Sequence, residues 1–337
     1  MRGRSLSRTH VVIIDGTLSR LVEGEETNAG LLYKLLSEML PRTDLLVTYL
    51  PGIQGSGFRK WVNIAAGVGI NLTIRAGYAA LSRAYAPGDK ILLFGFSRGA
   101  YAVRSLAGMI GRIGLLKSEH MTSRRAQRAF RHYEMNLNGA KSKAFNRAYC
   151  HKDIKIEMIG VWDTVKALGL PYPILTRIAP MATEFHDHRL GPAIVNAFQA
   201  LALDETRDAY EPILWQCQKG WRGQVQQLWF PGTHSDVGGN IEGFQAARPL
   251  SNIPFHWMLD NAANCGLPLP DGWKTRFPTD PAAEMIGPYD GLSKLFLFRT
   301  PRKACNTPFD GLHISVEERQ AVLSDYQPKA MICGPES

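Results

Sequence analysis

Four short, largely apolar runs stand out along the chain, and each is followed at once by glycine, proline or polar residues. They cover residues 11–14, 90–94, 154–162 and 225–230. Runs of this length with such boundaries predict buried strands. The segment after the second run predicts a helix, because its apolar side chains recur at three- and four-residue spacing: Ala100, Val103, Ala107 and Ile110. Strands alternating with helices predict an α/β fold, with a mostly parallel sheet between two helical layers.

The second predicted strand runs directly into a Gly-x-Ser-x-Gly motif at residues 95–99, and the predicted helix follows. This order is typical of a nucleophile elbow, in which a strained turn exposes a serine hydroxyl at the tip of a strand. Gly95 and Gly99 would let the helix and the neighbouring strands approach closely. We therefore expect Ser97 to be a nucleophile rather than an ordinary loop serine.

A serine hydroxyl is a weak nucleophile, so it needs a base, and that base needs an orienting acid. On an α/β-hydrolase sheet these residues follow in the order Ser, Asp or Glu, His. Asp163 comes directly after the third predicted strand, and His234 follows the fourth within a short loop. The sequence thus predicts His234 as the general base and Asp163 as its orienting carboxylate.

Other residues compete for these roles. Asp236 lies two positions after the predicted base and is expected to support its loop. Asp204 follows a helix-like stretch, which favours a local charge network. His313 is the alternative base, but Ser315 with Glu318 three positions later predicts a helix start there. That pattern favours a structural role for His313.

Acyl transfer also needs hydrogen-bond donors for the developing oxyanion. One is usually the backbone N–H after the nucleophile, here that of Arg98, and the other comes from the loop after a neighbouring strand. The first predicted strand ends in Asp15-Gly16-Thr17. Gly16 permits a tight turn that could aim the Thr17 N–H into the site, and Asp15 could hold that turn. A plain Asp-Gly turn is the alternative interpretation.

Several segments together resemble one family: the α/β-hydrolase domain family, formerly of unknown function, that contains phospholipase effectors of bacterial type VI secretion. The matching segments are residues 12–17, 85–89, 95–101, 160–165, 202–207, 229–239 and 312–319, and the resemblance spans about residues 9–328. It implies an α/β-hydrolase core, a triad at Ser97, Asp163 and His234, and cleavage of a glycerophospholipid acyl ester.

Two features depart from the pattern of that family. Leu18 follows the Asp-Gly-Thr segment where the family commonly has an aromatic residue, which bears on the rim of the site. The effectors also usually carry membrane-docking or delivery segments, for which 337 residues leave little room, and this bears on a role as a toxin.

Length and composition fit one enzyme. The 337 residues, 45% of them hydrophobic, predict a single α/β-hydrolase domain over 1–337, with a loose tail over 327–337. Five scattered cysteines without C-x-x-C spacing argue against a disulfide framework or structural zinc. His186 and His188 have no third ligand nearby, so we expect them to be surface or structural residues. The predicted chemistry implies neither a metal nor an organic cofactor.

The amino-terminal residues are basic, but only four apolar residues precede Asp15, which is too short for the apolar region of a signal peptide. No apolar run is long enough to span a bilayer. We expect a cytoplasmic location, and export by a dedicated secretion apparatus would need no such signal.

The net charge of +9 is unevenly distributed along the chain. Residues 117–152 hold nine Lys and Arg against two Glu, a local balance of +7. Because this segment lies between the predicted nucleophile and its acid, we expect a basic helical cap beside the Ser97 pocket. Such a cap would attract phosphate headgroups or an anionic membrane. A solvated helix face is the alternative, and nucleic-acid binding is disfavoured because the local aromatics form no recognisable module.

These observations predict a serine carboxylic-ester hydrolase that works through an acyl-enzyme, with a glycerophospholipid acyl ester as the favoured substrate. A soluble esterase for a smaller or polymeric ester is the first alternative. A non-catalytic binding protein on a hydrolase fold is the second.

Overall fold

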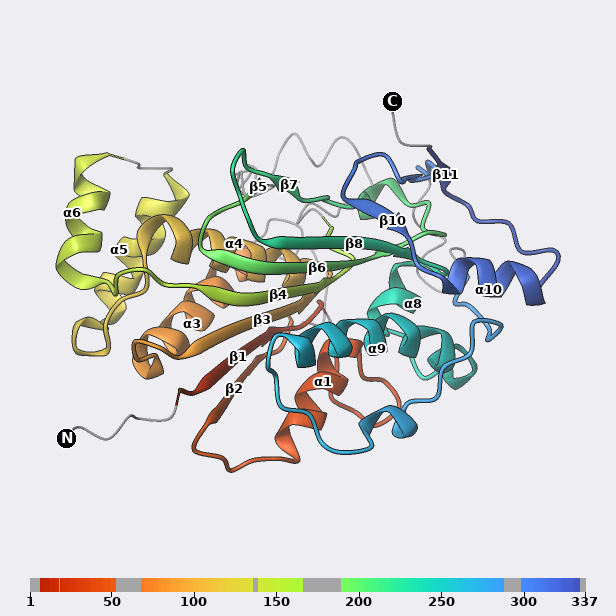
Figure 1. The fold of residues 1–337 in the computed structure, drawn as a ribbon, viewed down its shortest axis with the longest axis horizontal. Helices are drawn as coiled ribbons and strands as arrows, with labels where there is room; N and C mark the ends of the chain where they lie inside the picture. The colour runs from red at the N-terminus through yellow and green to blue at the C-terminus, as the bar shows by residue number, and fades with distance from the viewer. Residues whose placement is uncertain are drawn as a thin grey trace.

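The computed structural model describes residues 7–17, 19–52, 68–135, 139–165, 189–287 and 298–333. Its centre is a seven-stranded sheet with the order β10-β8-β6-β4-β3-β1-β2, in which all neighbouring strands are parallel (Figure 1). The strands are β1 (Thr9–Ile14), β2 (Leu45–Leu50), β3 (Lys90–Phe96), β4 (Ile156–Trp162), β6 (Ile194–Ala202), β8 (Gln224–Phe230) and β10 (Asp310–Leu312). The four predicted strands correspond to β1, β3, β4 and β8, and the predicted α/β fold is confirmed.

Strand β6 occupies the stretch before Asp204 that looked helix-like in the sequence. Alanine and leucine favour helices intrinsically, but this segment lies between β4 and β8, and its last six residues are buried. A central strand is stabilised by two hydrogen-bonded neighbours and by packing on both faces, which outweighs local propensity. The helix-like interpretation of this stretch is therefore wrong.

Helices cover both faces of the sheet. On one face lie α3 (Val68–Ala84), α4 (Arg98–Ile113), α5 (Ser123–Glu134) and α6 (Ala140–Tyr149). On the other lie α1 (Asn28–Ser37) and α9 (Arg248–Asn264), below the sheet in Figure 1. Alternate strand residues enter the two cores: Leu93 packs in the cluster with α3 and α4, while Leu92 packs in the cluster with α1 and α9. This is the period-two pattern of a sheet that is buried on both sides.

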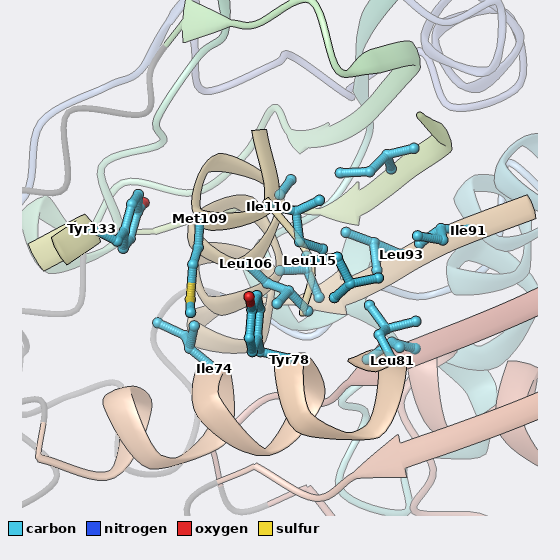
Figure 2. Packing of buried hydrophobic residues seen from close by; sticks show 14 of the residues in the cluster. Ile74, Tyr78, Leu81, Ile91, Leu93, Leu106, Met109, Ile110, Leu115 and Tyr133 are labelled. Atoms are coloured by element: carbon cyan, nitrogen blue, oxygen red, sulfur yellow. The ribbon is translucent and has the colours of Figure 1, made fainter. Parts of the chain in front are cut away.

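The core beneath α4 fixes the direction of that helix. Figure 2 shows side chains of α3 and α4 meeting Ile91 and Leu93 of β3 in one buried cluster. Tyr78 of α3 is fully buried in it, and its hydroxyl donates to the Gly114 carbonyl, 2.8 Å away, just beyond the carboxyl end of α4. Helix α4 is thereby held along the sheet from the tip of β3 to the opposite edge.

The described part of the basic segment 117–152 contains the helices α5 and α6, but the predicted position beside Ser97 is wrong. Its helices α5 and α6 pack against α3 and the far end of α4, at the left of Figure 1, whereas α8 (His234–Gly238) lies at the right. The 16 residues of α4 separate this segment from Ser97 by about 24 Å at 1.5 Å per residue. Figure 1 places these helices where β1 and β3 begin, at the amino edge of the sheet.

The carboxyl-terminal region adds a small parallel sheet and a helix. Strand β11 (Met331–Ile332) pairs with β9 (Lys303–Ala304), and α10 (Ser315–Val322) follows β10. The tail expected to be loose from position 327 is thus anchored through Ile332, and residues 334–337 lie outside the described residues. Short elements complete the chain: β5 (Arg189–Leu190), β7 (Gln216–Cys217), and the 3₁₀ turns Ser118–His120, Asp208–Tyr210, Gln245–Ala247 and Trp273–Arg276. Within the described ranges, no helix combines the length and apolarity needed to cross a membrane.

Candidate active site

Ser97 stands on the one-residue turn between β3 and α4, in the strained backbone conformation expected of a nucleophile elbow. Its φ of 57° and ψ of −122° lie in a region that L-residues rarely adopt. Glycine is required on both sides of it. A Cβ on Gly99 would lie 2.1 Å from the Ile14 carbonyl oxygen, and one on Gly95 would lie 2.6 Å from the Gly99 carbonyl oxygen. The two glycines therefore let α4 start directly against the end of β1.

His234 bridges Ser97 and Asp163, which lie 137 and 71 positions away from it. Its Nε2 is 2.9 Å from Ser97 Oγ, and its Nδ1 is 2.6 Å from Asp163 Oδ2. All three side chains are buried. The three strand-end residues singled out from the sequence thus meet in one hydrogen-bonded row at the carboxyl edge of the sheet. This arrangement can pass a proton from the serine hydroxyl to the imidazole.

Asp163 is held by a residue that the sequence did not point to. The buried Arg302 guanidinium donates from Nη1 to Asp163 Oδ1 at 2.7 Å and from Nη2 to Oδ2 at 2.9 Å, and the Ala202 N–H adds a bond of 3.0 Å to Oδ1. Burial alone would raise the pKa of Asp163, but the Arg302 charge and the bond to His234 outweigh it and hold that pKa well below its usual range. Asp163 is therefore a carboxylate that accepts hydrogen bonds on both oxygens.

Arg302 reaches the site from the carboxyl-terminal region. Its own carbonyl accepts from Met331 N–H at 2.8 Å, so the small β9–β11 sheet holds its backbone. Nη1 also donates to the Ala202 carbonyl at 2.8 Å, and Nη2 to the Tyr210 carbonyl. No local pattern in the sequence predicts this contact, because Arg302 follows Thr-Pro in a stretch without periodicity. Only an excess of arginine over acidic residues in that stretch could have indicated that one of these arginines pairs with a distant acid.

Aromatic rings and a buried ion pair enclose His234. Phe96 stacks on its ring with centroids 4.8 Å apart, and Tyr210 lies 4.7 Å away at a tilt. The His234 backbone N–H donates to Glu205 Oε2 at 3.2 Å, and Glu205 pairs with Arg207. Burial lowers the pKa of His234, although the Asp163 carboxylate acts to raise it. The imidazole is therefore neutral near pH 7, which is the form that accepts a proton.

Asp236 supports the histidine loop and does not touch the imidazole in the contacts described. It forms a capping box with Thr233, accepting from Thr233 N–H at 2.8 Å, and its other oxygen accepts from Ile286 N–H at 2.9 Å. Burial raises the pKa of Asp236 to about 6. Asp236 thus fixes the start of α8, the helix that carries His234 as its first residue.

The turn after β1 is tied down by Asp15, as the sequence predicted. Asp15 Oδ1 accepts from the Gly16 N–H at 2.6 Å and from the Thr27 hydroxyl at 2.7 Å, and Oδ2 accepts from the Tyr49 hydroxyl at 2.7 Å. This turn leads into Thr17, and the preceding Asp15 carbonyl lies against Gly99 at the start of α4. The two segments expected to supply oxyanion donors are thus in contact. Leu18 lies outside the described residues.

The competing residues have other partners. His313 Nδ1 lies 2.9 Å from the Ser315 hydroxyl and 3.2 Å from its backbone N, and its ring stacks on Phe230. Helix α10 begins at Ser315 itself with Ile314 at the N-cap, so the predicted capping role of Ser315 is wrong and the imidazole serves that first turn instead. Burial lowers the pKa of His313 to about 4. Its structural role agrees with the sequence interpretation.

Asp204 ties three backbone segments together. It accepts from Gly232 N–H at 2.7 Å, from the Tyr326 hydroxyl at 2.8 Å and from Lys329 N–H at 2.9 Å. Among the residues that the structure describes, no group of three His, Cys, Asp or Glu side chains could hold a metal ion. His186 and His188 lie outside those residues.

Comparison with known proteins gives a family and several distant relatives. A sequence profile of the family described as T6SS phospholipase effector Tle1-like, catalytic domain, matches residues 8–261. Uncharacterized protein YEL023C of Saccharomyces cerevisiae is 31% identical over 193 residues, which cover 49% of this chain and 28% of the yeast protein. Similar sequences therefore also occur outside bacteria.

Two solved structures resemble the chain. The Tle1 effector bound to the VgrG spike of the type 6 secretion system has a TM-score of 0.40 and 20% identity, and the match covers 70% of this chain and 51% of that one. An uncharacterized protein from Pseudomonas aeruginosa has a TM-score of 0.43 and 16% identity, with coverage of 81% and 49%. The matched region is thus about half of each of these longer chains, and a smaller share of the yeast protein.

Proposed function

The chain belongs to the family of T6SS Tle1-like phospholipase effector catalytic domains, which are lipase- or esterase-type hydrolases, and we propose that it is a serine hydrolase of glycerophospholipid acyl esters. The observation that carries this proposal is the hydrogen-bonded row Ser97–His234–Asp163 on a strained strand–helix turn. Family membership supports the lipid substrate, and the row supports the chemistry.

In the first half of the reaction, His234 Nε2 accepts the proton of the Ser97 hydroxyl as Oγ attacks the ester carbonyl carbon. The carbonyl π electrons move onto oxygen, which becomes the oxyanion. We assign the backbone N–H groups of Arg98 and Thr17 to this oxygen, because their segments meet beside Ser97. When the intermediate collapses, His234 returns the proton to the departing alcohol, and an acyl-Ser97 ester remains.

In the second half, His234 takes a proton from water, and the hydroxide adds to the acyl carbonyl. Collapse breaks the bond to Ser97 Oγ, which regains its proton from His234, and the fatty acid leaves. The two halves use the same atoms in the same positions, so one arrangement suffices for both. No other reactant besides the ester and water enters this balance.

Asp163 and Arg302 set the state of the base. A carboxylate that accepts the Nδ1–H of His234 keeps the unprotonated Nε2 directed toward Ser97. The bidentate contact with Arg302 keeps that carboxylate ionised and fixed in its plane. We therefore assign Arg302 as a positioning residue that acts through Asp163. It lies beyond the residues matched by the family profile, 8–261.

A fluorophosphonate probe followed by a lipid panel tests this function. The probe should label wild-type protein at Ser97 and leave Ser97→Ala unlabelled, with His313→Ala as a matched control that still reacts. Mass spectrometry of a panel of phospholipids, lysophospholipids, triacylglycerols and short soluble esters then identifies the ester that is cleaved. An unlabelled wild-type protein would contradict the catalytic proposal and leave the binding-protein alternative. Labelling with cleavage of short esters alone would favour the soluble esterase.

A further inference from the structure

Arg98, the residue directly after the nucleophile, differs from the other arginines in the interior. Four buried or half-buried arginines each donate to a defined acceptor: Arg302 to Asp163, Arg207 to Glu205, Arg104 to the Gln199 side chain and Arg248 to the Glu26 carbonyl. Within the described part of the chain, the Arg98 guanidinium has neither an ion-pair partner nor a hydrogen-bond acceptor. In this respect Arg98 differs from these four arginines.

The Arg98 side chain is half-buried and does not extend freely into water. Burial lowers the pKa of its guanidinium to about 10, although the nearby Tyr210 acts to raise it, so the group is still a cation at neutral pH. Tyr210 is also the residue whose ring lies 4.7 Å from the His234 ring. Arg98 directly follows Ser97 at the start of α4, and its charge is close enough to Tyr210 for the two groups to interact.

An interior cation without a partner is unfavourable for the free protein. The penalty is relieved when a ligand brings a negative charge to it. A guanidinium presents several N–H donors in one plane and binds phosphate oxygens in pairs, which is why arginine is common where phosphate groups are recognised. A glycerophospholipid carries its phosphodiester on the carbon next to an acyl ester, whereas a triacylglycerol or a simple ester brings no charge.

We propose that the Arg98 side chain binds the phosphodiester of the substrate, while the backbone N–H of the same residue faces the oxyanion. This inference rests on the proposed function and adds the residue that recognises the phosphodiester of the substrate. One residue would then link headgroup recognition to the reacting carbonyl. The site would favour glycerophospholipids over neutral lipids with the same acyl chains.

The test separates binding from turnover by using the Ser97→Ala protein, which cannot hydrolyse its ligand. Affinities are measured for a monomeric short-chain phosphatidylcholine and for the matched diacylglycerol, with and without Arg98→Gln. Glutamine keeps the backbone N–H and removes only the charge. We expect phosphatidylcholine binding to weaken about 10- to 100-fold, as for loss of a charged hydrogen bond, and diacylglycerol binding to change less than about 3-fold. Arg98→Lys should weaken phosphatidylcholine binding less than Arg98→Gln does. Arg128→Gln on α5 should change the affinity for neither ligand.

The proposal is overturned if Arg98→Gln weakens both ligands equally, which indicates a structural role, or if it weakens neither. It is also overturned if millimolar phosphatidylcholine does not bind. Inorganic phosphate serves as a competitor: weak competition is expected, whereas phosphate binding as tight as that of the lipid would mean that the site takes free phosphate. A wild-type protein that binds phosphatidylcholine through Arg98 yet cleaves no ester would refute the proposed function and leave this inference standing.

Discussion

The two ends of the central sheet are both rich in charged side chains, but these are buried and paired at one end and exposed to solvent at the other. At the carboxyl edge, Asp163, Glu205, Arg207 and Arg302 are buried, and each is paired with an opposite charge. At the amino edge, α5 and α6 expose a row of cations to solvent: Arg124, Arg128, Arg131, Lys141, Lys143 and Arg147. In the described part of the chain, none of these six forms an ion pair with an acid.

This difference determines how strongly the charges of each segment interact with their surroundings. A buried, paired charge has lost its water, so its interactions are strong and its geometry is fixed. An exposed charge keeps its water and is screened within about 8 Å at physiological ionic strength. The segment with the most charges in the sequence is therefore expected to have the weakest electrostatic effect on the reacting atoms. The sparse charges around Asp163 are expected to have the strongest.

The largest effect should come from the row itself. Ser97→Ala and His234→Ala should each lower kcat on a cleaved ester by about 10⁴-fold or more, because the three residues act as a unit. Asp163→Asn should cost somewhat less. Initial rates and melting curves measure both activity and fold. An active His234→Ala protein together with an inactive His313→Ala protein would reverse the assignment of the base.

Removal of Arg302 tests whether a buried pair at the carboxyl edge controls the chemistry. Arg302→Gln should lower kcat/KM about 10- to 100-fold and move the rising limb of the pH–rate profile to higher pH. The reason is that an Asp163 charge no longer offset by a cation stabilises the protonated form of His234 more strongly. Arg302→Lys should restore part of both properties.

Arg319 offers a matched control for that experiment. It is also a buried arginine of the carboxyl-terminal region, but it donates to the Pro281 and Ala283 carbonyls instead of to Asp163. Arg319→Gln should lower the melting temperature and leave the pH limb in place. If both variants moved the limb equally, Arg302 would have no specific role in positioning.

The pH profile of the wild-type protein should show a smaller effect, which also arises from the buried surroundings of His234. Burial lowers the pKa of His234 below 6.5, and only the neutral imidazole accepts the Ser97 proton, so kcat/KM should rise with pH through an apparent pKa below 6.5. Asp236 also titrates near this range, with a pKa of about 6. Asp236→Asn should keep the limb where it is. A limb centred above about 7 would contradict this account of the base.

Reversal of charge at the amino edge should give the smallest effect. Arg124→Glu, Arg128→Glu and Arg131→Glu combined should leave kcat/KM on a short soluble ester within about 2-fold, because about 24 Å and a screening solvent separate them from Ser97. Activity on anionic vesicles should also stay within that range, with the triple Gln variant as a control. A vesicle-specific loss that fades with added salt would instead establish a membrane-docking role for this face.

The position of α5 and α6 at the amino edge follows from the topology of the sheet, and it could have been deduced from their place in the sequence. Residues 114–155 connect the end of α4 to the start of β4, and a helix that follows a parallel strand runs back to the amino edge. Any insertion between that helix and the next strand must emerge at that edge. A cap over a nucleophile has to be inserted after a strand. The order of the basic segment in the chain, between nucleophile and acid, was therefore a misleading guide to its place.

Local patterns in the sequence were enough to predict four of the seven strands, β1, β3, β4 and β8, together with the strained serine turn and the residues at three strand tips. Those signals are local: an apolar run, two glycines at positions with no room for a Cβ, and a polar residue at the end of each strand. They did not determine the tertiary contacts that complete the site. Arg302 reaches Asp163 across 139 positions, and β6 became a strand only because β4 and β8 flank it. Such contacts depend on the burial of side chains between distant segments, which no local pattern records.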